Sequence, residues 1–127
     1  MTAPENWSVE EADAALPRIT RIIEDVRATL AGTRDHARTA AATASGNGHS
    51  SSRAAALTFQ EAVERLAAEG IVLRDADRGL VDFPSISSDG RPYWLCWVLG
   101  EPSVAWWHWP QDGFLGRQPL DRRPDRT

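Results

Sequence analysis

An unbroken stripe of apolar residues at helical spacing opens the chain and constrains its fold more than any other feature. Its members alternate spacings of three and four positions, which is typical of a helix that packs against another helix. They are Val9, Ala12, Leu16, Ile19, Ile23, Val26 and Leu30. The stripe predicts a helix from Val9 to about Ala44, with Ser8 and Glu11 as a capping box. Because proline removes a backbone donor, we expect a kink or a restart at Pro17.

A second helix of the same type is predicted from about Arg53 to Glu69. Gly70 follows at the position of a C-terminal cap. The polar stretch 45–52, SGNGHSSS, is interpreted as a flexible connector. The two helices therefore form an antiparallel hairpin. Because its apolar stripes are narrow and rich in alanine, the hairpin needs a further surface to pack against.

The second half of the chain has the alternation of a small antiparallel sheet. Four strands are predicted near residues 71–74, 80–83, 93–99 and 103–109, with the second stopped by Pro84. If Val98 faces Val104 across a hairpin, Cys96 and His108 share one face. That face carries Trp94, Cys96, Val98, Val104, Trp106 and His108, and the other carries Tyr93, Leu95, Trp97, Leu99, Ala105, Trp107 and Trp109. Both faces are apolar, so we expect helices over one and a loop or a second subunit over the other.

Length and composition fit one soluble α+β domain. We assign residues 1–120 to this domain, with the helical hairpin at 7–69, the sheet at 71–109 and a flexible tail at 121–127. A net charge of −4 disfavours nucleic-acid and membrane partners, and a single cysteine excludes a disulfide framework. Residues 1–7 lack the features of a signal peptide and no apolar run has the length of a membrane span. A cytoplasmic protein is therefore predicted.

Several short motifs punctuate the second half of the chain. They are GLVDFP (79–84), LCW (95–97), GEP (100–102), WWH (106–108) and GFLGRQP (113–119). Their order and spacing resemble a bacterial family known as domain of unknown function 2203, over roughly residues 7–120. The resemblance implies a small protein built from a helical hairpin and strands. It implies no activity, since the family has none assigned.

The polar residues within these motifs are Asp82, Cys96, Glu101, His108 and Arg117. Taken singly, each favours a structural role. Asp82 caps a turn or pairs with an arginine, Cys96 is a small buried hydrophobe, and Glu101 is a solvated turn residue. His108 is a hydrogen-bonded residue among tryptophans. Arg117 ties the C-terminal segment to a carboxylate such as Asp82, or binds an anion.

Strand geometry limits which of these residues can meet in one subunit. In an extended strand Glu101 and His108 are about 23 Å apart, so they cannot share a site. Cys96 and His108 lie diagonally on one face, and Asp82 on a neighbouring strand completes a cluster. Such a cluster suits either a zinc ion with an open position for water or a cysteine nucleophile activated by His108. Any catalytic or metal chemistry is therefore predicted at Asp82, Cys96 and His108.

The sequence as a whole favours a binding or self-associating module over an enzyme. Tryptophan-rich surfaces bury large areas at interfaces, and a homodimer would cover the thin helical stripes. Trp106, Glu101 and Arg117 are the candidate ligand-binding residues, because an aromatic ring beside an arginine suits a planar or anionic molecule. No cofactor is predicted. Zinc belongs to the alternative, a metal-dependent or cysteine-dependent enzyme that uses Asp82, Cys96 and His108.

Overall fold

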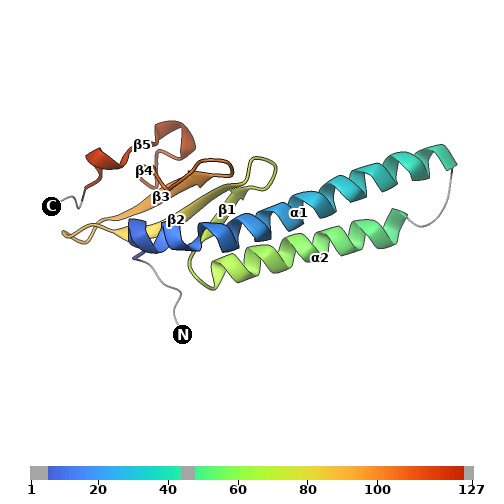
Figure 1. Cartoon of the computed structure of the whole chain (residues 1–127), viewed down its shortest axis with the longest axis horizontal. Coiled ribbons are helices and arrows are strands. Elements are labelled where there is room, and N and C mark those ends of the chain that lie inside the picture. The colour runs from blue at the N-terminus through green and yellow to red at the C-terminus, as the bar shows by residue number, and fades with distance from the viewer. Residues whose placement is uncertain (1–5, 44–47, 125–127) are drawn as a thin grey trace.

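Two long helices and a five-stranded antiparallel sheet make up the fold (Figure 1). The computed structural model describes residues 6–43 and 48–124. Along the chain the elements are α1 (Val9–Thr43), α2 (Gly48–Ala67), β1 (Val72–Asp75), β2 (Leu80–Ile86), β3 (Pro92–Val98), β4 (Trp106–His108), η1 (Phe114–Gly116), β5 (Gln118–Pro119) and η2 (Leu120–Arg122). The predicted α+β class is confirmed, but the sheet has five strands instead of about four.

Helix α1 begins where the sequence predicts and continues for 35 residues, about 52 Å. The capping box fixes its start: the Glu11 amide donates to Ser8 Oγ at 3.0 Å, and the Ser8 amide donates to Glu11 Oε1 at 3.1 Å. Pro17 lies inside the helix and does not end it, so the expected restart is wrong. The proline itself is exposed, whereas Leu16 and Ile19 are buried in the core. Their packing holds the turn that the missing donor weakens.

Helix α2 begins at Gly48, earlier than the predicted start at Arg53. Residues 48–52 are thus helical where a connector was expected, and residues 44–47 of that connector lie outside the described residues. Serine and histidine cost only tenths of a kcal/mol each in a helix, so α2 extends through residues 49–52. The two helices run antiparallel and project together well beyond the sheet (Figure 1). Within the described residues, neither helix combines the length and apolar composition that a membrane span requires.

The sheet is an antiparallel meander in which each strand pairs with the next along the chain. Strands β3 and β4 pair in the predicted register, with Trp94 opposite His108 and Cys96 opposite Trp106. On the other side of β3, Asp82 of β2 lies opposite Cys96. The register therefore gathers polar residues of three neighbouring strands.

The turn between β1 and β2 depends on a glycine. Gly79 has a φ of +69°, and a Cβ at this position would lie 2.5 Å from the Cβ of Leu99. The Leu99 amide also donates to the Gly79 carbonyl at 2.9 Å, which draws the two backbones together. Only glycine fits both the φ value and this close approach.

Three details of the sheet differ from the prediction. Strand β2 continues through Pro84, because β1 begins only at Val72, opposite Asp82, and no β1 residue pairs with the proline. Strand β4 is confined to residues 106–108, since the Val104 amide donates to Asp13 Oδ1 of α1 at 2.7 Å. Val104 consequently packs in the helix-facing core and not on the face of Cys96. Strand β5 has two residues, too few to leave an alternating pattern.

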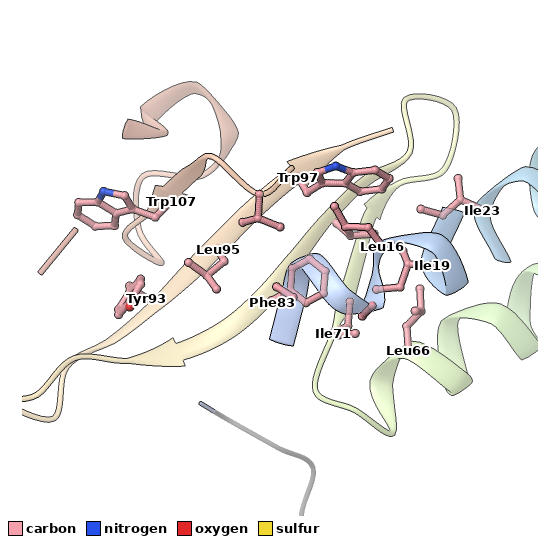
Figure 2. Close-up of a cluster of buried hydrophobic side chains, with 14 residues drawn as sticks. Leu16, Ile19, Ile23, Leu66, Ile71, Phe83, Tyr93, Leu95, Trp97 and Trp107 are labelled. Carbon is pink, nitrogen blue, oxygen red and sulfur yellow. The ribbon is translucent and has the colours of Figure 1, made fainter. Parts of the chain in front are cut away.

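Helices α1 and α2 cover one face of the sheet and form the core with it. The buried members of this core are Ala12, Ala15, Leu16, Ile19, Ile23, Leu66, Ile71, Val81, Phe83, Tyr93, Leu95, Trp97, Val104 and Trp107. Figure 2 shows Leu16 and Ile19 of α1 beside Trp97 of β3. Tyr93, Leu95 and Trp97 of β3, which alternation placed together on one face, therefore face the helices.

The opposite face of the sheet has a rim of stacked arginines and tryptophans. Arg74 of β1 lies over Trp94, with its guanidinium carbon 5.0 Å from the ring centre. Arg117, which directly precedes β5, lies over Trp106 at 4.7 Å. The segment that follows β4 thus covers part of this face. Of the two coverings expected from the sequence, a loop or a second subunit, the loop is the one seen here.

Candidate functional site

Three neighbouring strands place Asp82, Cys96 and His108 together on the face away from the helices. Asp82 is directly opposite Cys96, and His108 is opposite Trp94, diagonal to Cys96. One donor atom from each of the three residues lies within 4.8 Å of the donor atoms of the other two. All three side chains are buried. The trio that strand geometry singled out therefore lies in one subunit.

His108 is held by oxygen atoms at both ring nitrogens. Its Nδ1 lies 2.8 Å from the Trp109 carbonyl, and its Nε2 lies 2.9 Å from Asp82 Oδ2. Burial opposes the charged imidazolium, but the hydrogen bonds to Asp82 and Trp109 and the charge of Asp82 outweigh it and raise the pKa of His108. Because both nitrogens face acceptors, the ring is stabilised by a proton on each, or by another cation in place of one proton.

The two carboxylate oxygens of Asp82 have different surroundings. Oδ2 accepts a hydrogen bond from Arg74 Nε at 2.9 Å and also faces His108. Oδ1 is buried and accepts no hydrogen bond from any described residue. Leaving a buried polar atom without a partner costs about 1–3 kcal/mol, and more when the group is charged. Oδ1 therefore remains available to a further ligand.

The Cys96 thiol is fully buried beside this carboxylate. Burial, and then the negative charge of Asp82, raise the pKa of Cys96 to about 12, although the nearby positive charge of Arg117 acts in the opposite direction. A thiol with this pKa is protonated at neutral pH and is a poor nucleophile. A metal ion, in contrast, deprotonates a coordinating thiol directly.

The other predicted candidates lie at the rim of the cluster, where Arg117 is close to the Cys96 thiol. Arg117 pairs with Glu101 at 3.1 Å and stacks on Trp106. Glu101 Oε1 in addition accepts the Val98 amide at 2.8 Å, which closes the turn after β3. Arg117 thus ties the C-terminal segment to a carboxylate, as its structural interpretation expects, but the carboxylate is Glu101 and not Asp82.

Arg74 is the member of the site that sequence reasoning missed. It ends the predicted strand 71–74, belongs to none of the motifs and resembles any exposed arginine of an edge strand. Only the general expectation that Asp82 pairs with an arginine pointed towards it. The salt bridge to Asp82 at 2.9 Å shows which arginine this is.

The donor set suits a borderline-soft divalent ion such as Zn²⁺, which binds thiolate, imidazole and carboxylate ligands. Tetrahedral zinc places its ligand atoms about 3.3–3.8 Å apart. From separations within 4.8 Å, small side-chain movements would reach this geometry. The Nδ1 contact of His108 with the Trp109 carbonyl is also the outer contact that metal-bound histidines make, because it leaves Nε2 to the metal.

Together the fold and the cluster define a small α+β protein in which helices cover one face of a meander and a Cys-His-Asp cluster lies buried on the other. The chain belongs to the DUF2203 family, described as an uncharacterized conserved protein, whose model matches residues 5–120. The resemblance stated from the motifs is thereby confirmed. No curated protein and no solved structure matches the chain.

Proposed function

We propose that this protein binds one zinc-like divalent ion through Asp82, Cys96 and His108. The observation that carries the proposal is the Asp82 carboxylate: one of its oxygens lies within 4.8 Å of donor atoms of Cys96 and His108, and its buried Oδ1 has no hydrogen-bond partner among the described residues. Three potential ligands of the types that zinc prefers, on three adjacent strands, support it further.

The local charges favour an ion in place of protons. Once Nε2 of His108 is deprotonated, it and Asp82 Oδ2 are both acceptors at 2.9 Å, and they repel each other unless a cation binds Nε2. A divalent ion would bind in exchange for the Nε2 proton and the Cys96 proton. Binding is therefore coupled to proton release and weakens as the pH falls.

Of the two chemistries that the sequence left open, metal binding has the stronger support. A cysteine nucleophile needs an accessible thiolate, whereas Cys96 is fully buried with its pKa raised to about 12. Three protein ligands leave a fourth coordination position, which holds water in catalytic zinc sites. A metal-dependent hydrolytic activity is the enzyme reading that remains compatible with this donor set.

The test is metal uptake by purified protein. Protein prepared without chelator, and chelator-treated protein titrated with Zn²⁺, should both hold one ion per chain by elemental analysis. Cys96→Val, His108→Gln and Asp82→Asn should each lose it. Asp89→Asn is the matched control, since Asp89 is also paired with an arginine but lies on the exposed β2–β3 turn. Equal uptake by the wild type and the three cluster variants would overturn the proposal.

The projecting helices favour a second candidate function, self-association. Among the residues whose burial is described, the core shared with the sheet reaches Ile23 on α1 and Leu66 on α2, and Val26 and Ala62 are buried one turn further on. Both helices continue well beyond the sheet (Figure 1). Two helices alone bury little apolar surface, and a second copy would cover them. A groove of about 550 Å³ between the helices is lined by Ile22 and by charges of both signs, such as Arg65 and Asp25.

Light scattering tests this second candidate. We expect the wild type to have the molar mass of a dimer and Arg65→Glu to shift it towards the monomer, because the variant places like charges in the groove. Arg91→Glu, on the distant β2–β3 turn, is the control. A monomeric wild type at high protein concentration would rule out self-association.

A further inference from the structure

Arg74 lies at an irregularity in the edge strand, on the face of the sheet that carries Asp82. Leu73 of β1 pairs with Val81, but the next pair joins Asp75 to Leu80, so Arg74 is an extra residue at a β-bulge. Bulges redirect a side chain and increase the local twist, and they occur often beside functional sites. The Arg74 guanidinium lies over the sheet face that carries the cluster.

Two contacts then fix the guanidinium. Its Nε donates to Asp82 Oδ2 at 2.9 Å, and its carbon lies 5.0 Å from the centre of the Trp94 ring. Trp94 is itself the residue opposite His108 across the sheet. The Arg74 side chain remains 43% exposed, although its Nε contacts the buried carboxylate.

We propose that Arg74 is a positioning residue that decides which oxygen of Asp82 binds the metal ion. This inference rests on the proposed function. Arg74 occupies Oδ2, and Oδ1, which accepts no hydrogen bond from any described residue, is left to coordinate. Asp82 then binds through one oxygen, and the protein supplies three ligand atoms with a fourth position open.

Positioning and charge make opposite predictions for this arginine, so they can be separated. The thiolate and the carboxylate carry two negative charges, and the cation of Arg74 offsets one of them. If charge dominated, removal of Arg74 would strengthen binding of a cation. If positioning dominates, removal weakens binding, because Asp82 loses the contact that holds its orientation; loss of such outer contacts costs about 10–100-fold in affinity.

The molecule contains a close internal control. Arg91 makes the same two contacts elsewhere: its Nε donates to Asp89 at 2.9 Å, and its guanidinium lies 4.9 Å from the Trp109 ring centre. Arg74→Gln and Arg74→Lys can therefore be compared with Arg91→Gln and Arg91→Lys. The lysine variants keep the charge and lose the Nε that reaches the carboxylate.

The experiment is a Co²⁺ titration of chelator-treated protein, followed by absorption spectroscopy. The wild type and both Arg91 variants should show intense four-coordinate d–d bands and a thiolate-to-cobalt charge-transfer band. Both Arg74 variants should keep the charge-transfer band, since Cys96 still binds, and bind Co²⁺ about 10–100-fold more weakly. Their d–d bands should be weaker, because Asp82 is free to coordinate through both oxygens and raise the coordination number.

Three results would count against the inference, and they differ in whether the proposed metal site remains supported. Wild-type affinity and spectra in both Arg74 variants would overturn the role of Arg74 and leave the metal site intact. Tighter binding by Arg74→Gln would show that charge and not positioning governs the site. A wild type without a charge-transfer band would overturn the metal site and the inference together.

Discussion

The Nε2 of His108 lies 2.9 Å from Oδ2 of Asp82, although the strands that carry them are separated by β3. The two side chains meet above the middle strand, where Cys96 lies between them in the sheet. The contact joins residues 26 positions apart, so the cluster forms only after the meander has formed. Its chemistry can accordingly be tested through stability as well as through metal content.

Replacement of Cys96 by valine should barely affect the metal-free protein. Valine fills a similar apolar volume, so in the presence of chelator we expect Cys96→Val to lower the free energy of unfolding by at most about 1–1.5 kcal/mol. His108→Ala should cost more, about 2–3 kcal/mol, because it leaves Asp82 Oδ2 with fewer partners and opens a cavity. Urea denaturation measures both. A larger loss for Cys96→Val than for His108→Ala would contradict this order.

The Cys96 thiol should react slowly in the folded protein. With its pKa raised to about 12, the thiolate fraction near neutral pH is small, and the side chain is fully buried. We expect alkylation at about pH 8 to be at least about a thousandfold slower than in urea-unfolded protein. Timed iodoacetamide labelling with mass spectrometry measures this. Rapid labelling of folded protein below pH 7 would restore the nucleophile reading.

The stability of the metal-free protein should depend on pH through His108. The folded-state pKa of His108 is raised above the ordinary 6.5, so its contribution is fully present below about pH 6.5. That contribution is lost as the pH rises through the folded-state value. The difference in unfolding free energy between the wild type and His108→Gln should therefore shrink above pH 6.5, measured by urea denaturation with chelator. A difference that stays constant with pH would show that the ring is neutral in the fold.

Two glycines with similar backbone angles should respond differently to alanine. Gly79 and Gly90 have φ values of +69° and +87°, but only at Gly79 would a Cβ meet another residue, at 2.5 Å from the Cβ of Leu99. Gly90→Ala should cost about 1 kcal/mol from backbone strain alone. Gly79→Ala should cost more than about 2 kcal/mol, because the turn or β3 must also shift. Equal losses in urea denaturation would mean that Leu99 moves aside freely.

Much of the fold could be predicted because local patterns and long-range packing agree. The stripe ending near Leu30 predicts α1, and the Ser8–Glu11 capping box sets its first residue. The β3–β4 register follows from alternation, since a shift by one residue would turn Cys96 and His108 to the other face. The same register, predicted from the sequence, placed Cys96 and His108 close together.

The departures arise where a distant contact overrides the local pattern. Val104 continues the alternation of a strand, yet its amide bonds to Asp13 of α1, and no local signal announces that contact. Arg74 lies at a bulge where the β1–β2 pairing shifts by one residue, and no local pattern indicates this shift or the pairing of Arg74 with Asp82. Strand β5 is held by its pairing with β4 and has too few residues for a pattern. The arginine of the site therefore could not be read from the sequence.

Successive residues of β3 point alternately to the two faces of the sheet. Tyr93, Leu95 and Trp97 fill the core beneath the helices, while Cys96 faces the cluster on the other side. Deletion of one residue within this strand would present a bulky apolar side chain to Asp82 and bury the thiol against α1. Selection should therefore remove insertions and deletions in β3 for two reasons, because they disrupt both the core and the cluster. Changes in the length of the two helices at the end away from the sheet should leave the core and the cluster intact.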